Sequence, residues 1–203
     1  MYNLTNNQVA IEGEVSSPLT PAFKFNEEKF YSFKLRVPRL SGTDDYIPVV
    51  VSERIIDVNY DWMGEYVKIE GQFRSFNDHK SPKHRLVLNV FVKEMWRDEP
   101  STEGDTNKIV LDGYLCKEPV YRKTPLGREI ADMLVAVNRA YGKSDYIPCI
   151  CWGRNARYAS GFFYKAKLLY ISRNGCLSNI VPFLTKALDQ GFLCVNFISF
   201  YKL

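Results

Sequence analysis

The sequence predicts an all-β protein that contains two copies of one small barrel module. The first observation is a repeat. Residues 7–15 match residues 107–115, and residues 37–48 match residues 137–148, so both matches share one offset of 100 residues. The second observation is that short runs of alternating apolar and polar residues occur in both halves. Two separate matches at one offset indicate an internal duplication.

Alternating apolar residues predict five strands in the first copy: Val9–Val15, Tyr31–Val37, Tyr46–Val51, Val67–Phe73 and Leu86–Val92. The segment Ser17–Asn26 carries Pro18 and Pro21 and is expected to form a long hairpin loop. The segment Ser52–Asp61, after the third strand, is expected to hold a short helix. Five short strands with a helix after the third are the pattern of an OB-fold, a five-stranded Greek-key barrel.

The second copy begins in the same way. Ile109–Leu115 and Ala131–Val137 are predicted strands, and Tyr121–Arg128 between them is a basic hairpin loop that turns at Gly127. A second turn at Gly142 leads into a strand in which Ile147, Cys149 and Cys151 face the core. A helix is expected to begin within Gly153–Tyr158.

The pattern weakens after this helix. Leu169–Arg173 is the expected fourth strand, Thr185–Gln190 a short helix, and Phe192–Phe200 a last strand. Residues 174–203 differ abruptly in composition, through divergence or through a change of reading frame near residue 173. The sequence leaves open whether the second barrel is complete at its C-terminal end.

These patterns divide the chain into four parts. The first OB-fold covers residues 1–96, and a polar linker follows at 97–106. Strands one to four of the second OB-fold cover 107–173, and an atypical segment covers 174–203.

Composition excludes several classes of protein. Hydrophobic residues make up 46% of the 203 residues and charged residues 25%, as in an ordinary globular chain. No apolar run is long enough for a membrane span, and the first residues lack the pattern of a signal peptide. The five cysteines form no C-x-x-C pair and lie far from His79 and His84, so we expect free thiols in the cytoplasm, no metal site and no cofactor.

Charge is unevenly distributed along the chain. Residues 1–106 carry a net charge of −4, whereas residues 107–203 carry +8. This asymmetry predicts a polyanionic partner for the second copy.

The strand that ends at Trp152 carries two large rings on its outer face, Tyr146 and Trp152, with Arg139, Lys143 and Arg154 close in sequence. Rings interleaved with cations favour single-stranded nucleic acid, because bases stack on rings and phosphates need neutralising. Burial of this strand on both faces is the structural alternative. Tyr114, also on an outward strand position, is equally consistent with a contact between copies.

The second copy resembles the bacterial single-stranded DNA-binding protein family. The resemblance rests on Asn107-x-Ile-x-Leu-x-Gly, Pro119-x-x-Arg, Thr124-Pro-x-Gly, Ala136-Val-Asn-Arg and Tyr146-Ile-Pro-Cys-Ile-Cys-Trp-Gly-Arg-Asn-Ala. It implies sequence-independent binding of single-stranded DNA in replication, repair and recombination, at the nucleoid. It also implies four OB-folds per assembly, hence a homodimer of this chain, with replication or repair proteins as further partners.

Carried over residue by residue, the family's stacking rings fall at or near Tyr141, Tyr146 and Trp152. Its phosphate-contacting cations fall around Arg122, Lys123, Arg128, Arg139 and Arg154, with Lys143 beside them. The first copy has Ser52 where the second has Trp152, so we expect it to bind more weakly. Its candidate surface comprises Lys34, Arg36, Arg39, Tyr46, Arg74 and Phe76.

The sequence contains no phosphate-binding loop, no nucleophile elbow and no histidine beside a plausible nucleophile, so we expect no enzymatic activity. An alternative function of a different class is an OB-fold scaffold for protein–protein contacts in a replication or primosome complex. The acidic first copy suits that alternative better than the second copy does.

Overall fold

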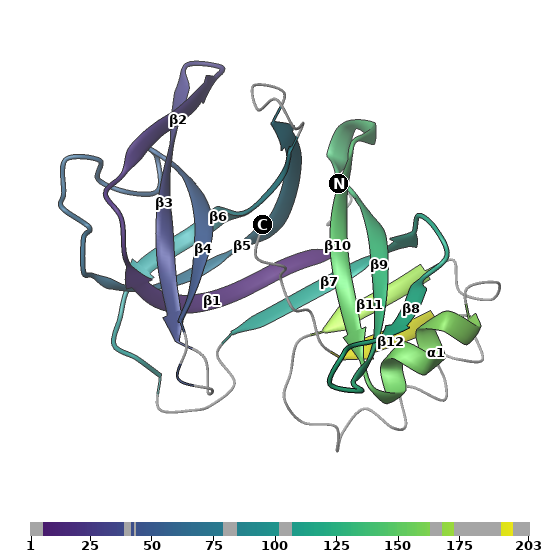
Figure 1. The fold of residues 1–203 in the computed structure, drawn as a ribbon. Coiled ribbons are helices and arrows are strands. Elements are labelled where there is room, and N and C mark those ends of the chain that lie inside the picture. Colours follow the sequence, from purple (N-terminus) through teal and green to yellow (C-terminus); the bar gives the residue numbers. More distant parts are fainter. Residues whose placement is uncertain are drawn as a thin grey trace. The chain divides into compact units, whose positions relative to one another are not determined.

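The computed structural model describes residues 6–38, 42, 44–78, 85–101, 107–162, 168–172 and 192–196. The chain divides into two compact units. One is Gln8–Asn107, and the other begins at Lys108 and includes Asn6, whose carbonyl oxygen accepts the backbone N–H of Asp112 at 2.7 Å. Each unit is built mainly from strands, and the second also contains an α-helix (Figure 1).

The first unit is a closed five-stranded barrel. Its strands are β1 (Asn7–Val15), β3 (Glu28–Pro38), β4 (Asp44–Ser52), β5 (Tyr66–Asp78) and β6 (Arg85–Arg97). The ring closes because β1 pairs with both β3 and β5, β3 pairs with β4, and β6 joins β5 to β4. Only the β4–β6 pair is parallel. The alternating residues expected to face inward do so: Leu35, Val49 and Val67 are fully buried. This is the predicted OB-fold.

The expected hairpin loop at Ser17–Asn26 is wrong, because most of it is a strand. β2 (Thr20–Phe25) pairs antiparallel with β3. Asn26 and Glu27 both have positive φ and make the tight turn that a hairpin requires. Pro21 is compatible with this strand because β2 lies at the edge of the sheet. At an edge a backbone N–H can face solvent, so the N–H that proline lacks is not needed for strand pairing.

The helix expected within Ser52–Asp61 is also wrong, because the connection forms turns. Asp57 Oδ1 accepts the N–H of Asn59 at 2.9 Å, and Asp61 Oδ1 accepts the N–H of Met63 at 3.1 Å. Aspartate side chains that bond to the backbone two residues ahead compete with helical hydrogen bonding. The positions of Asp57 and Asp61 therefore favour turns over a helix in this segment.

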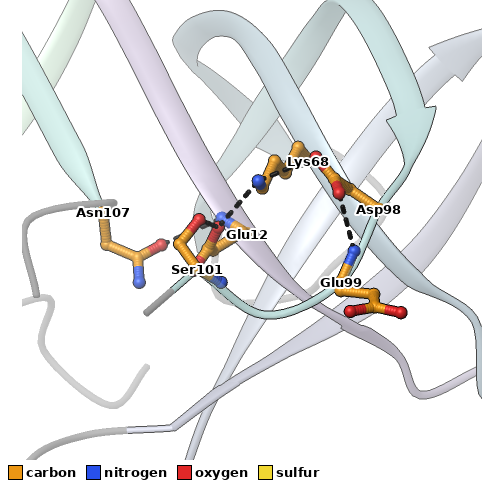
Figure 2. Close-up of polar contacts among 6 residues, drawn as sticks. All are labelled: Glu12, Lys68, Asp98, Glu99, Ser101 and Asn107. Carbon is orange, nitrogen blue, oxygen red and sulfur yellow. Dashed lines mark hydrogen bonds and ion pairs between the residues drawn. The ribbon is translucent and has the colours of Figure 1, made fainter. Parts of the chain in front are cut away.

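A buried carboxylate holds the segment that follows the barrel (Figure 2). The side chain of Glu12 on β1 accepts hydrogen bonds from the N–H and Oγ of Ser101, at 3.2 and 2.7 Å. The N–H of Glu12 donates to Asn107 Oδ1 at 3.0 Å, while Lys68 lies 2.7 Å from the carboxylate of Asp98. The beginning of the expected linker is thus hydrogen-bonded to the first barrel.

The second unit repeats the first strands. β7 (Lys108–Leu115), β8 (Val120–Lys123), β9 (Glu129–Asn138) and β10 (Ser144–Trp152) correspond to β1 to β4 at an offset of about 100 residues. β9 pairs with β7, β8 and β10. Ile147, Cys149 and Cys151 are buried, as the alternation predicted. The expected turn glycines, Gly127 and Gly142, both have positive φ.

The helix expected after β10 is present as α1 (Arg154–Phe162), which packs against β9 and β10. It starts directly after Gly153, whose φ is +58°. Ala156 and Ala159 are fully buried, and the guanidinium of Arg157 lies 2.9 Å from the carboxylate of Glu129. The helix therefore covers the end of the strand pair that carries Trp152.

The last two strands depart from the first unit. β11 (Leu168–Ser172) pairs antiparallel with β7, as β5 does with β1. β12 (Phe192–Asn196) is the expected last strand, but it runs parallel to β11, whereas β5 and β6 are antiparallel. Within the described ranges no pairing joins β12 to β10, so the ring that closes the first barrel has no counterpart there. The helix expected at 185–190 lies outside the described residues.

Candidate nucleic-acid interface

Two exposed tyrosines flank a small residue on the outer face of the second unit. Tyr114 on β7 and Tyr146 on β10 both lie directly opposite Ala136 of β9. Their side chains are 47% and 51% exposed. Gly113, next to Tyr114, permits the close approach of β7 to β9, because a side chain there would collide with the carbonyl oxygen of Ala136. Three adjacent strands thus present two ring surfaces in one row.

Trp152 occupies the other end of the same face. It lies opposite Ile130, which is buried, and across β9 from Arg122. The indole is half-buried, and its Nε1 is buried without a hydrogen-bond partner among the described residues. Ile150, which strand alternation places on the same face as Trp152, is buried as well. Trp152 therefore combines a packing role with a partly accessible ring.

Tyr141 stands at the turn between β9 and β10, within the short helix η1 (Ala140–Gly142). Its side chain is fully exposed, and its φ of +62° is rare for a residue with a side chain. The adjacent Lys143 is also exposed. This turn therefore presents a free ring beside a cation, as stacking and phosphate binding require.

The predicted cations differ in their surroundings. Lys123, Arg128, Lys143 and Arg154 are exposed and have no ion pair within the described part of the chain. The Nε of Arg122 lies 2.7 Å from Asp132, and both side chains are partly exposed. The Nε of Arg139 donates to Asp145 Oδ2 at 2.5 Å, and its Nη2 donates to Oδ1. Arg139 therefore has a structural partner, whereas the four exposed cations are available to an anion.

Hydrogen bonding and burial raise the pKa values of three neutral side chains in this unit. Tyr121 donates to Glu129 at 2.8 Å, which raises the pKa of the phenol. Burial raises the pKa of the Cys149 thiol to about 12 and also raises that of the Cys151 thiol. Neither thiol is therefore a nucleophile at neutral pH.

In the first copy, two of the candidate cations are paired with other residues of the protein. Arg36 pairs with Glu14 and, at 3.3 Å, with Asp44, and Arg74 donates to Gln72. Lys34, Tyr46 and Phe76 are exposed, with Tyr46 at 57% and Phe76 at 50%. Arg39 lies outside the described residues.

Sequence reasoning missed the aromatic residues of β2. Phe23 and Phe25 are exposed, and Phe23 stacks on Phe30. They were missed because their segment was interpreted as a loop. The alternation of Phe23-Lys-Phe25 is the one signal that could have identified this strand and its ring-bearing face.

Residues 106–175 match the family described as "Single-strand binding protein family". The resemblance to bacterial single-stranded DNA-binding proteins is confirmed for this segment. The chain is 36% identical over 72 residues to single-stranded DNA-binding protein 3 of Clostridium acetobutylicum, covering 32% of this chain and 50% of that protein. It is 37% identical over 68 residues to single-stranded DNA-binding protein A of Bacillus subtilis, covering 30% and 40%. The chain thus spans half or less of the length of these two relatives.

Similarity of fold to solved structures extends over a larger part of the chain than similarity of sequence does. The crystal structure of the wild-type single-stranded DNA-binding protein from Thermus aquaticus superimposes with a TM-score of 0.65 at 19% identity, covering 83% of this chain and 84% of that one. A deletion mutant of the same protein gives a TM-score of 0.62 at 20% identity. At this identity the likeness concerns the fold, and it spans both units.

Among the described residues, no helix is long and apolar enough to cross a membrane. The same residues contain no cluster of three or more histidine, cysteine or acidic side chains placed to hold a metal ion.

Proposed function

We propose that this chain binds single-stranded DNA without sequence preference, chiefly through the second unit. The observation that carries the proposal is the outer face of β7, β9 and β10, where Tyr114 and Tyr146 flank Ala136 and Trp152 lies farther along. Bases stack on such rings whatever their identity, which explains the lack of sequence preference. The matches to single-stranded DNA-binding proteins support this assignment.

Within this proposal, Tyr141, Tyr146 and Trp152 take bases, and Tyr114 joins them. Lys123, Arg128, Lys143 and Arg154 contact phosphates, and Arg122 does so by exchanging Asp132 for the DNA. Arg139 acts as a positioning residue, because its guanidinium orders the β9–β10 turn that carries Tyr141. The weaker first-copy surface, Lys34, Arg36, Tyr46, Arg74 and Phe76, extends the path.

The biological setting is part of the same proposal. The chain acts in replication, repair and recombination, as a homodimer that brings four OB-folds together, and it contacts replication or repair proteins. We place it at the nucleoid in the cytoplasm and assign it no enzymatic activity. The relatives' names support DNA binding and say nothing of these partners.

A fluorescence titration with poly(dT) tests the proposal. Of the three tryptophans, Trp62 and Trp96 lie in the first unit, so a Trp62→Phe/Trp96→Phe variant makes Trp152 the sole reporter. We expect saturable quenching that weakens with salt, by about 0.7 log units per log unit of salt for each phosphate contact. Duplex DNA of equal length is the control. No quenching of either protein at low salt contradicts the proposal and favours the protein–protein scaffold.

A further inference from the structure

Both ends of the segment that follows the first barrel are held by one residue, Glu12 on β1 (Figure 2). At the start of the segment, the Glu12 carboxylate accepts hydrogen bonds from the N–H and the hydroxyl of Ser101, at 3.2 and 2.7 Å. At its end, the N–H of Glu12 donates to Asn107 Oδ1 at 3.0 Å. Because one residue makes both contacts, the chain between Ser101 and Asn107 begins and ends at the same place on the first unit.

The Glu12 side chain is buried, and several donors surround its charge. It is 7% exposed, and the Nζ of Lys68, its cross-strand neighbour on β5, lies 4.0 Å from its carboxylate. Burial, the charge of Glu12 and a hydrogen bond to it raise the pKa of Tyr66 to about 12. A carboxylate removed from water needs such partners. The two donors of Ser101 therefore complete a set of contacts that β5 begins.

The chain is also held where it leaves β6. The Nζ of Lys68 lies 2.7 Å from Asp98 Oδ2, so one lysine contacts both Glu12 and the first residue after the strand. The contact between Lys68 and Asp98 raises the pKa of the lysine and lowers that of the aspartate. The N–H of Asp98 donates to the carbonyl oxygen of Tyr66 at 3.1 Å. Residues 98–101 therefore follow the surface of β1 and β5 as an ordered strap.

The equivalent residue of the second unit, Asp112, has different surroundings. It lies 100 residues after Glu12, on β7. Its Oδ1 is buried and has no hydrogen-bond partner among the residues that the structure describes. Tyr170 of β11 stands opposite Asp112, whereas Lys68 stands opposite Glu12. The arrangement around Glu12 therefore distinguishes the first copy from the second.

We propose that Glu12 anchors both ends of the linker, so that residues 101–107 form a closed loop and the chain leaves the first unit at Asn107 rather than at Arg97. A free linker of about ten residues has a root-mean-square span of about 17 Å, and the anchor removes this freedom. Release of Ser101 leaves a buried carboxylate without two of its donors, which opposes opening. The anchor thus limits the movement of the connection between the units, and it does so without any DNA contact.

Hydrogen exchange of the full chain tests the anchor, because the exchange rate of a hydrogen-bonded amide reports how often its bond opens. Mass spectrometry with electron-transfer fragmentation resolves the amide of residue 101. The variants are Glu12→Gln, which keeps the size of the side chain and removes its charge, and Ser101→Ala, which removes the hydroxyl outside the barrel. Glu14→Gln is the matched control, because it makes the same change two residues farther along β1, where the carboxylate contacts Arg36.

We expect Glu12→Gln and Ser101→Ala each to speed exchange at residue 101 about fivefold, after correction for intrinsic rates, because each weakens or removes a hydrogen bond to a charged group. Glu14→Gln leaves the rate unchanged. Ser101→Asp places a second carboxylate beside Glu12 and speeds exchange further. Adding Glu12→Gln to Ser101→Asp restores part of the protection, because the amide can donate to the new carboxylate.

A longer linker distinguishes an anchored loop from a segment that is merely stretched between the two units. Five Gly/Ser residues inserted between Gly104 and Asp105 double the length of the loop, and closure entropy then speeds exchange at residue 101 only about threefold. A stretched segment instead loses its protection when it is lengthened, and that result overturns the inference.

Equal exchange rates in Glu12→Gln, Ser101→Ala and Glu14→Gln also overturn it. Circular dichroism establishes that each variant is folded. If Glu12→Gln unfolds the first unit, Ser101→Ala and the insertion still decide, because neither changes a residue of the barrel.

Discussion

The guanidinium of Arg139 holds the buried carboxylate of Asp145 across the turn between β9 and β10. Two hydrogen bonds join them, and the Asp145 side chain is fully buried. A carboxylate removed from water needs such a partner, because its desolvation is costly. The pair therefore fixes the turn from which Tyr141 and Lys143 project.

Replacing Arg139 by alanine is expected to destabilise the second unit. Truncation leaves Asp145 buried without its cation, which lowers the free energy of unfolding by about 3 kcal/mol. Urea denaturation followed by circular dichroism measures this loss. The control Lys143→Ala, at an exposed neighbouring position, is expected to change stability by less than about 0.5 kcal/mol. Full stability of Arg139→Ala together with lost DNA binding contradicts the positioning role and makes Arg139 a direct phosphate contact.

Trp152 variants separate stacking from packing. Trp152→Phe retains a ring and is expected to keep most of the DNA affinity. Trp152→Leu retains apolar volume beside Ile130 without a ring, and is expected to lose about 1–3 kcal/mol of binding free energy. Anisotropy titrations and thermal unfolding of each variant provide the two readouts. If Trp152→Leu unfolds the protein or leaves binding intact, the ring serves the core alone.

Single substitutions of the exposed cations are expected to change the salt dependence. Lys123→Gln and Arg128→Gln each remove one phosphate contact and lower the slope of log affinity against log salt by about 0.7. Arg122→Gln is expected to lower it less, because Asp132 already neutralises this arginine at 2.7 Å. If all three variants keep the slope of the unmodified chain, the Tyr121–Arg128 hairpin does not bind phosphate.

Cys116, Cys149 and Cys151 are expected to differ in reactivity. Cys116 is exposed, whereas Cys149 and Cys151 are buried, and burial raises the pKa of Cys149 to about 12. Iodoacetamide at pH 8 is therefore expected to modify Cys116 and to leave Cys149 and Cys151 unmodified, as peptide mapping by mass spectrometry measures. Burial also raises the pKa of Cys116, so the reaction is slow. Labelling of Cys149 as fast as Cys116 shows that the inner face of β10 is open.

The stability of the first unit is expected to fall at alkaline pH. Burial, followed by the charge of Glu12, raises the pKa of Tyr66 to about 12, above the ordinary value of 10. The unfolded chain therefore loses this proton first, and the stabilisation present below pH 10 is lost as the pH rises towards 12. Urea midpoints between pH 8 and 11.5 measure the slope, and Tyr66→Phe is expected to reduce it. An identical slope in Tyr66→Phe assigns the effect to other groups.

Periodicity predicted those parts of the fold in which local pattern and burial agree. β4 (Asp44–Ser52) and β10 (Ser144–Trp152) stand exactly 100 residues apart, as the repeat requires. Val49 and Val51 in one strand, and Cys149 and Cys151 in the other, are buried on the predicted face. Prediction failed where short-range side-chain chemistry or an edge position changed the outcome. Asp57 and Asp61 favoured turns over a helix, and Pro21 was accommodated in an edge strand.

For the candidate site, residue types were predictable and their environments were not. Tyr146 and Trp152 occupy the outer face that alternation assigned to them, yet the first is half exposed and the second partly packed. Arg139 carries the same charge as Arg128, but only Arg139 meets a buried acid. Such differences depend on residues brought together by strand pairing.

The sequence by itself determined the duplication, the strand periodicity and the resemblance of residues 107–156 to single-stranded DNA-binding proteins, because these depend on residue order alone. Tertiary structure decided which strands pair, that β12 runs parallel to β11, and that Tyr114 and Tyr146 share one row across Ala136. It also stacked Phe23 on Phe30, which lies opposite Ser52, the residue that stands in the first copy where the second has Trp152. The physical reason is that a stacking surface is assembled across strands, so its rings are neighbours in space and not in sequence.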